Sequence, residues 1–301
     1  MTLSPLVSIV VPSRDGKIDR LRAELAKQSF QDYEIVVNTE PPTPAHARNG
    51  GAADAIGEYL IFFDDDVRLS HPGLLGELVQ ALQNAVPLSV VGVRDALAKD
   101  TNWFQRYIYC RSFHPEVNES ADPVVEVNWH GVINGRCMAM SRQTFDAIGG
   151  YDSKLIAGED FEILYRIQRA GGKVYALSKG RVYYYPPPTL KVLLKKTIWY
   201  AHGNAQVARK YPESNYSWVL KGVGSAVFFL IFRTLCLIPL SFLKMSYHNR
   251  RIRFAFRPFE VLLSYFAAWV YCIAWFKTPP TGDPNQGLDA AARISTGVTA
   301  G

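Results

Sequence analysis

The feature that most constrains the fold is an apolar run at residues 59–63 that ends directly in three aspartates, Asp64, Asp65 and Asp66. A continuous apolar run of this length is typical of a strand buried on both faces of a parallel sheet. Side chains two residues apart in an extended chain point to the same side, so we expect Asp64 and Asp66 to converge. Two convergent carboxylates favour Mg²⁺, which proteins often hold with one or two carboxylates and substrate phosphates. The alternative is an acidic loop that only ends the strand and caps the following helix.

The first part of the chain alternates strand-like and helix-like patterns at short intervals. We expect strands at residues 7–11, 34–37, 59–63, 88–93, 136–140 and 181–185. We expect helices at residues 17–28, 45–56, 73–84, 143–148 and 160–170. This alternation predicts an α/β fold with helices packed on a mainly parallel sheet. In such a sheet, ligands bind at the carboxyl ends of the strands.

Aromatic residues are frequent in the irregular segment 101–134. They are Trp103, Phe104, Tyr107, Tyr109, Phe113 and Trp129. We interpret them as core residues, with the lining of a substrate cleft as the alternative.

Basic residues are concentrated in the C-terminal third. Residues 191–257 hold 12 Lys or Arg against one acid, Glu213, although the net charge of the whole chain is only +6. Two apolar stretches, 222–243 and 259–276, lie in or beside this segment. They favour an anionic membrane surface over nucleic acid as its partner.

Each apolar stretch is close to the roughly 20 residues that cross a bilayer, but neither is a clean spanning helix. Arg233 lies at the centre of the first, and the second is short. The connector holds a basic cluster of the kind that normally stays cytoplasmic: Lys244, Arg250, Arg251, Arg253 and Arg257. We therefore favour a pair of in-plane or re-entrant helices, with a spanning hairpin and two core helices of a soluble protein as alternatives.

These patterns divide the chain into three parts. We expect an enzymatic α/β domain at residues 1–190, a membrane-associating helical region at 191–277 and a disordered tail of small and polar residues at 278–301. The start of the chain lacks a secretory signal pattern, so we expect the protein at the cytoplasmic face of the cell membrane. Neither a disulfide framework nor a zinc site is indicated by the widely spaced cysteines, Cys110, Cys137, Cys236 and Cys272.

Six separated segments resemble family 2 glycosyltransferases with the GT-A fold. They read Val-Ser-Ile-Val-Val-Pro-Ser-Arg at 7–14, Glu-Ile-Val-Val at 34–37, Ala-Arg-Asn at 47–49, Gly-Glu-Tyr-Leu-Ile-Phe-Phe-Asp-Asp-Asp at 57–66, Ile-Gly-Gly-Tyr-Asp at 148–152 and Gly-Glu-Asp at 158–160. Each segment is weak alone, but their joint order and spacing argue against coincidence. The resemblance covers residues 6–185.

The resemblance implies a nucleotide-sugar donor and a divalent cation, Mg²⁺ or Mn²⁺, at the aspartates. It implies direct metal contact by Asp66, with Asp64 as the other metal residue, and it places Asp64 and Asp65 near the ribose and the metal waters. A cation there would neutralise charge on the departing diphosphate.

The resemblance also places the loop that begins at Pro12, together with Arg14 and Arg48, around the nucleotide. A surface or ion-paired position is the alternative for each arginine. It further implies that the catalytic base lies in segment 158–160, where we choose Asp160, with Glu159 as the second candidate.

A carboxylate at this position would take the proton from an acceptor hydroxyl as it attacks the anomeric carbon, which inverts the configuration in one displacement. The alternative for Asp160 is a helix N-cap, because an acid before Phe161 satisfies free backbone N–H groups and meets the positive end of the helix dipole.

Two positions depart from the family pattern. Many members have an Asp after the second strand, where this chain has Asn38 followed by Thr39 and Glu40; we expect Asn38 and Glu40 to bind the nucleotide with an altered base preference. Many members also have a His after the strand that here ends in three tyrosines. His202 is a candidate substitute, and a structural role is its alternative.

We therefore expect an inverting glycosyltransferase that acts on a lipid-linked or cell-surface glycan acceptor. One alternative is a sugar-phosphate nucleotidyltransferase, although no Gly-rich phosphate loop follows the first strand. The other is a non-catalytic, membrane-attached protein that binds nucleotide sugars.

Overall fold

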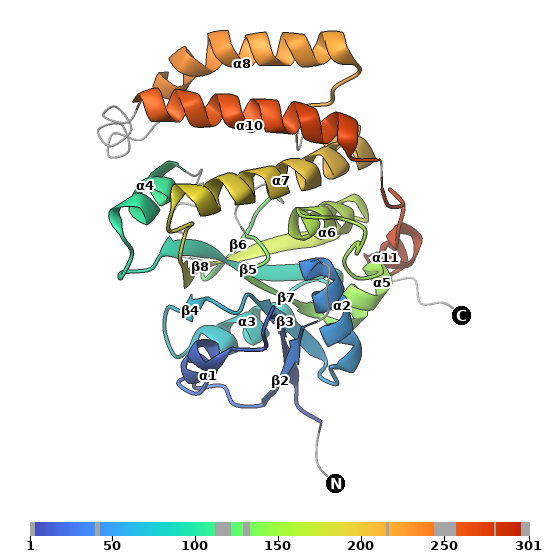
Figure 1. Ribbon diagram of the computed structural model, residues 1–301. Helices are drawn as coiled ribbons and strands as arrows, with labels where there is room; N and C mark the ends of the chain where they lie inside the picture. Colours follow the sequence, from blue (N-terminus) through green and yellow to red (C-terminus); the bar gives the residue numbers. More distant parts are fainter. Residues whose placement is uncertain are drawn as a thin grey trace.

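One eight-stranded sheet forms the centre of the molecule (Figure 1). The computed structural model describes residues 4–39, 43–111, 122–128, 133–214, 217–243, 257–279 and 281–295. The strands are β1 (Val7–Pro12), β2 (Tyr33–Asn38), β3 (Tyr59–Phe63), β4 (Arg68–Leu69), β5 (Ser89–Leu97), β6 (Val124–Glu126), β7 (Cys137–Ser141) and β8 (Lys173–Tyr184). Their order is β2-β1-β3-β7-β5-β8-β4, and β6 also pairs with β8.

Helices follow most strands and cover the sheet. In the first part of the chain they are α1 (Asp19–Leu25), α2 (Pro44–Asp54), α3 (Leu74–Gln83), α4 (Trp103–Arg111), α5 (Arg142–Ile148) and α6 (Glu159–Arg169). The C-terminal part contributes α7 (Leu190–Lys210), the short 3-10 helix Pro212–Ser214, α8 (Val223–Leu243), α10 (Arg257–Lys277) and α11 (Leu288–Ser295).

The sheet is mixed but mostly parallel. Strand β1 lies between β2 and β3 and is parallel to both. Strand β7 is antiparallel to its neighbours β3 and β5, whereas β5 is parallel to β8. The expected α/β fold is confirmed, and the carboxyl ends of β1, β2 and β3 meet at one edge. The antiparallel insertion of β7 was not predicted, because the apolar pattern of a strand does not encode its direction.

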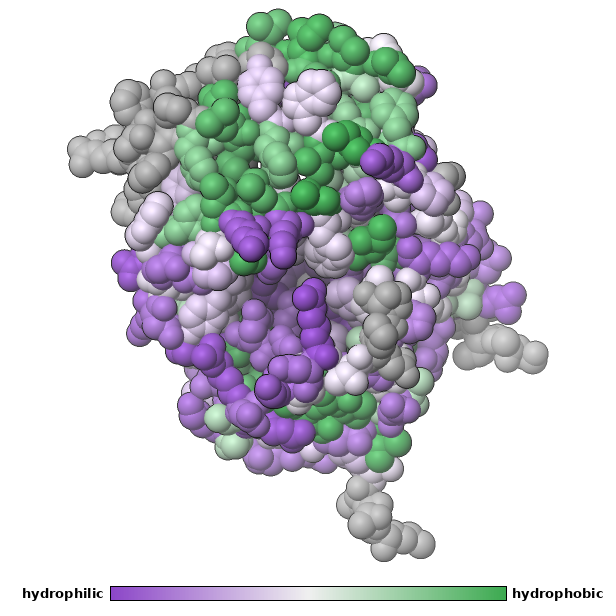
Figure 2. All heavy atoms as spheres, viewed as in Figure 1, coloured by the Kyte–Doolittle hydropathy of each residue, from purple (hydrophilic) through white to green (hydrophobic). Residues whose placement is uncertain are grey.

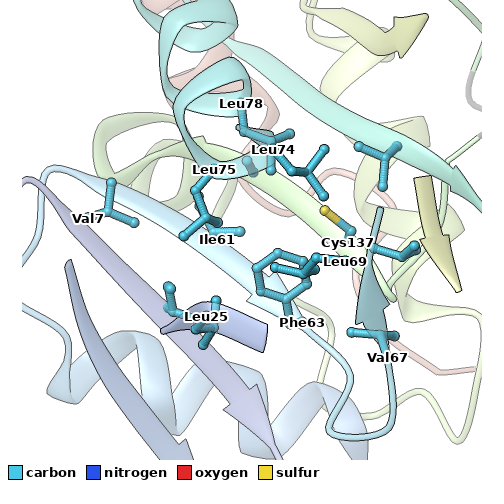
Figure 3. Packing of buried hydrophobic residues seen from close by; sticks show 14 of the residues in the cluster. Val7, Leu25, Ile61, Phe63, Val67, Leu69, Leu74, Leu75, Leu78 and Cys137 are labelled. Carbon is cyan, nitrogen blue, oxygen red and sulfur yellow. The ribbon is translucent and has the colours of Figure 1, made fainter. Parts of the chain in front are cut away.

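Apolar side chains fill both faces of the sheet, which explains the continuous apolar run in β3. Ile61 and Phe63 pack on one face among the leucines of α3, as Figure 3 shows. Leu60 and Phe62 point to the opposite face, where they join apolar residues of α5 and α6. Because successive side chains of a strand alternate between faces, a strand covered on both sides is apolar throughout.

The helix α4 corrects the expectation that residues 101–134 are irregular. Phe104 and Tyr107 are buried against Leu193 of α7 and Leu263 of α10. The core interpretation is therefore confirmed for these two aromatic residues, whereas the Trp103 side chain is exposed. Phe113 and Trp129 lie outside the described residues.

A buried ionic cluster fastens α7 to α6. The Lys210 ammonium lies 2.7 Å from a carboxylate oxygen of Asp152 and 2.8 Å from one of Glu162. Arg166 donates to both oxygens of Glu162, at 2.7 and 2.8 Å. Within α7, Gly203 allows close approach, because a Cβ there would lie 2.4 Å from the carbonyl oxygen of Ala157. The helix α7, which begins at the predicted domain boundary near residue 190, thus packs directly on the sheet domain.

Helix α10 packs on α7, and α8 packs on α10, through small and aromatic residues. In the part of the chain that the structure describes, no helix is long and apolar enough to span a bilayer. The membrane association of this region stays a prediction. Most of the basic connector lies outside the described residues.

The predicted disordered tail is wrong for residues 288–295, which form α11. This helix packs on α5 and α6, and Ala291 is fully buried there. Ser295 also donates a 2.9 Å hydrogen bond to the carbonyl oxygen of Ala170. The tail is small and polar on average, but Leu288, Ala291 and Ile294 give one face of the helix an apolar character that composition alone hides.

Candidate active site

A cavity of about 780 Å³ lies at the carboxyl ends of β1, β2 and β3. Its walls come from the loops after these strands, from the starts of α2 and α6 and from α7. The lining residues are Pro12, Ser13, Arg14, Asp15, Thr39, Thr43, Pro44, Ala47, Arg48, Asp64, Asp65, Asn134, Gly135, Arg136, Gly158, Glu159, Asp160, Phe161, Trp199 and Tyr200. Figure 2 shows a hollow between the polar surface of the sheet domain and the apolar surface of the C-terminal helices.

Arg48 of α2 joins the two acidic segments of the site. Its guanidinium contacts a carboxylate oxygen of Glu159 at 2.5 Å and one of Asp64 at 2.8 Å. The guanidinium also donates to the carbonyl oxygen of Gly135 at 3.2 Å. The guanidinium carbon lies 5.4 Å from the centre of the Tyr151 ring. Only 3% of Arg48 is exposed. Arg48 is thus ion-paired and also lines the cavity, and its contact with the nucleotide stays a prediction.

In this group one positive charge, on Arg48, faces two carboxylates. Burial alone would lower the pKa of Arg48, but the carboxylates of Glu159 and Asp64 raise it above its ordinary value. Burial raises the pKa of Glu159, and the Arg48 charge opposes that effect. Glu159 is thus held as the buried partner of Arg48, a role that leaves Asp160 as the better base candidate.

Asp160 is half-buried and lines the cavity near the start of α6. One carboxylate oxygen accepts a 2.9 Å hydrogen bond from the backbone N–H of Gly135, and the other accepts one of 2.9 Å from Phe161. The helix begins after Gly158, whose φ of +82° suits glycine. The N-cap alternative for Asp160 is wrong, because Gly158 is the N-cap and Asp160 lies within the first turn, where it accepts the N–H of its neighbour Phe161. Each oxygen keeps a further lone pair for a substrate proton.

The three aspartates after β3 do not share one orientation. Asp64 and Asp65 line the cavity, whereas Asp66 is exposed and is not part of the lining. The chain turns at Asp65 and Asp66, so the alternation rule for extended strands no longer applies there. Burial is the main cause that raises the pKa of Asp65. Direct metal contact by Asp66 stays a prediction.

The donor set fits Mg²⁺ or Mn²⁺ held jointly with a diphosphate. Among the described residues, no group of three or more His, Cys, Asp or Glu side chains forms a closed metal cage. Three consecutive carboxylates, Asp64, Asp65 and Asp66, place negative charge at this turn. Hard divalent cations take carboxylate oxygens, and Mg²⁺ commonly completes its shell with substrate phosphates and water.

The remaining predicted residues divide between the cavity and the interior. Pro12 and Arg14 line the cavity, as expected. Asn38 is buried at the end of β2 and does not line it, whereas its neighbour Thr39 does. Glu40 lies outside the described residues. His202 Nδ1 lies 2.6 Å from the Thr278 hydroxyl and away from the lining, which favours its structural role.

Several lining residues escaped prediction because they reach the site through tertiary contacts. Arg136 pairs with Asp95, and its guanidinium carbon lies 3.9 Å from the centre of the Tyr184 ring. Trp199 and Tyr200 come from α7, more than 130 residues after the aspartates. The only sequence signal for Arg136 is its place directly before the apolar strand β7.

Residues 4–200 match the family model described as glycosyltransferase like family 2. The chain belongs to this family. It is 32% identical over 77 residues to the succinoglycan biosynthesis protein ExoA of Rhizobium meliloti (strain 1021), covering 26% of this chain and 23% of that protein. It is 22% identical over 194 residues to the pre-mycofactocin glycosyltransferase of Mycobacterium tuberculosis, covering 64% of this chain and 40% of that protein. The chain thus spans less than half the length of these relatives.

The structure is similar to that of the mannosyltransferase PcManGT from Pyrobaculum calidifontis in complex with GDP-Man and Mn²⁺. The TM-score is 0.51 at 16% identity, and the match covers 98% of this chain and 88% of that chain. This likeness supports the GT-A-like fold.

Proposed function

We propose that this family 2 chain is an inverting glycosyltransferase that moves a sugar from a nucleoside diphosphate to a hydroxyl of a lipid-linked or cell-surface glycan acceptor. The observation that carries the proposal is the shared cavity: Asp160 lines the same space as Asp64 and Asp65. One wall thus offers a base, and another offers acidic groups suited to a metal-bound diphosphate.

The base role of Asp160 follows from how its carboxylate is held. Backbone N–H groups of Gly135 and Phe161 each fix one oxygen, so the group cannot turn away from the cavity without losing a hydrogen bond. A fixed carboxylate takes the proton of an acceptor hydroxyl while that oxygen attacks the anomeric carbon. A single displacement of this kind inverts the configuration.

The donor occupies the side of the cavity formed by the ends of β1, β2 and β3. Pro12, Arg14 and Thr39 line the space for the nucleotide, and the Arg14 charge suits a phosphate. Asp64 and Asp65, with Asp66 beside them, would hold Mg²⁺ or Mn²⁺. A bound cation would neutralise negative charge on the departing diphosphate. The GDP-Man and Mn²⁺ named for PcManGT support this reading.

A lipid-linked acceptor and a cytoplasmic membrane face are supported by the surface of the C-terminal helices. Figure 2 shows apolar residues gathered over these helices. The exposed ones include Val223, Phe228, Ile231, Leu235, Leu262 and Trp269. Together with the basic excess of residues 191–257, this surface suits helices that lie in the plane of an anionic membrane. Attachment there raises the effective concentration of amphiphilic acceptors.

Calorimetry with uridine, guanosine and thymidine diphosphates, with and without Mn²⁺, tests the donor site. We expect one diphosphate to bind in a Mn²⁺-dependent manner, and Asp65→Asn to weaken this binding by about tenfold or more. Asp65 is preferable to Asp64 as a target because Asp64 also pairs with Arg48. Asp100→Asn is the matched control, since Asp100 pairs with Arg68 at the exposed surface. Absence of binding by all three diphosphates, or equal binding by Asp65→Asn, would contradict the proposal.

A further inference from the structure

A second cavity, of about 280 Å³, opens between α7, α8 and α10. Tyr200 lines both this cavity and the catalytic one. The two cavities therefore adjoin at the Tyr200 side chain. Tyr200 is 43% exposed, and its phenol can donate a hydrogen bond.

The lining of this second cavity combines one cation with aromatic surface. Arg233 is the only Lys or Arg among the described residues that line it, and it lies within the apolar helix α8. The carbon of its guanidinium is 5.5 Å from the centre of the Phe229 ring. Trp218 and Tyr271 add further aromatic walls. A guanidinium stays charged and matches phosphate oxygens, and the rings suit a hydrocarbon chain.

We infer that the second cavity binds the phosphate and the first part of the apolar chain of a phosphate-bearing lipid, whose attached sugar is the acceptor. The inference rests on the proposed function and specifies its acceptor. The volume of about 280 Å³ lies just below the roughly 300–1,000 Å³ typical of ligand cavities, which suits a head group better than an oligosaccharide. The exposed apolar face of α8 and α10 leaves the rest of the chain in contact with the bilayer.

The chemistry of Asp160 decides which group of this lipid reacts. A phosphate oxygen is already anionic and needs no base, whereas a sugar hydroxyl must lose its proton. The phosphate therefore stays at Arg233, and the attached sugar supplies the nucleophile. Asp160 takes the hydroxyl proton, the hydroxyl oxygen bonds to the anomeric carbon, and the nucleoside diphosphate leaves with the electron pair of the broken bond.

Binding of dodecyl phosphate to the full chain, below its micelle-forming concentration, tests this site. Trp218 is part of the lining, so its fluorescence reports binding, and Trp218→Phe identifies its share of the signal. Dodecanol and inorganic phosphate separate the contributions of the chain and of the anion. We expect dodecyl phosphate to bind at least about tenfold more tightly than either, and Arg233→Gln to remove about a tenfold share of this affinity.

Two further variants keep the result interpretable. Ala267→Phe narrows the cavity without changing charge and should also weaken binding. Lys221→Gln removes an exposed charge just before α8, the helix that carries Arg233, and should leave binding within about twofold of wild type. Mn²⁺-dependent binding of the donor diphosphate, measured on each variant, shows that the protein is folded.

The outcomes separate this inference from the proposed function. Equal binding of dodecanol, equal binding of inorganic phosphate, or unchanged binding by both Arg233→Gln and Ala267→Phe overturns the lipid phosphate site while donor binding leaves the proposed function standing. If no nucleoside diphosphate binds the wild-type protein, the proposed function fails and the acceptor assignment fails with it.

Discussion

Replacing Arg48 with methionine should destabilise the protein by about 3–5 kcal/mol, because removal of one partner leaves a buried charge uncompensated. The magnitude comes mainly from Glu159, whose side chain is only 8% exposed. The pair with Asp64 contributes less, since that carboxylate is 34% exposed and water screens it. Methionine keeps the length and apolar stem of the side chain, so the change isolates the charge.

Urea unfolding of the single and double variants measures this effect. The double variant Arg48→Met/Glu159→Met replaces the pair with apolar groups, and we expect it to be more stable than Arg48→Met alone. Burial holds the pKa of Glu159 above its unfolded value, and loss of the Arg48 charge raises this pKa further. A carboxyl group with a raised folded pKa binds protons more tightly in the folded state. Stability is therefore lost as pH rises above the unfolded pKa.

The deficit of Arg48→Met should consequently be smaller at pH 5 than at pH 7.5. The reasoning fails if Arg48→Met unfolds within about 1 kcal/mol of wild type, which is below the range for a broken buried pair. It also fails if the Arg48 and Glu159 substitutions are additive, or if the deficit does not grow with pH.

Two further substitutions test how α7 is held against the sheet domain. Lys210→Met should destabilise the protein by about 3–5 kcal/mol in urea unfolding, because buried Asp152 loses its cation and Glu162 keeps only Arg166. Lys195→Met on the exposed face of the same helix should change stability by less than about 0.5 kcal/mol. Gly203→Ala should lower stability by about 1–3 kcal/mol, because the new Cβ pushes α7 away from Ala157. Gly224→Ala places its Cβ in open space and should be neutral or stabilising by up to about 1 kcal/mol. Equal effects within either pair would contradict this packing.

The sequence predicts the part of the site that depends on local pattern. The apolar runs locate β1, β2 and β3, and parallel pairing then brings Pro12, Arg14 and Asp64 to one edge. The acids at the start of α6 are likewise recognisable, since their place before a helix follows from spacing alone.

The remainder depends on tertiary geometry that no local pattern carries. An arginine in a small-residue helix reads equally well as a phosphate ligand or as an ion-pair partner, and only the fold places Arg48 between Glu159 and Asp64. The turn after β3 separates Asp66 from the cavity, although an extended chain would have aligned it with Asp64. Tyr200 lines the site because α7, although distant in sequence from β1, β2 and β3, packs beside the edge of the sheet where these strands end.

The most direct test compares sugar transfer by Asp160→Asn and Glu159→Gln at saturating donor, with donor binding measured in parallel. We expect Asp160→Asn to bind the donor diphosphate normally but to transfer sugar about 100-fold to 10,000-fold more slowly, because the base is lost. Glu159→Gln should be less stable, yet its folded fraction should keep transfer within about tenfold of wild type, since an amide oxygen still accepts from Arg48. Full transfer by folded Asp160→Asn would show that Asp160 is not the base of this enzyme.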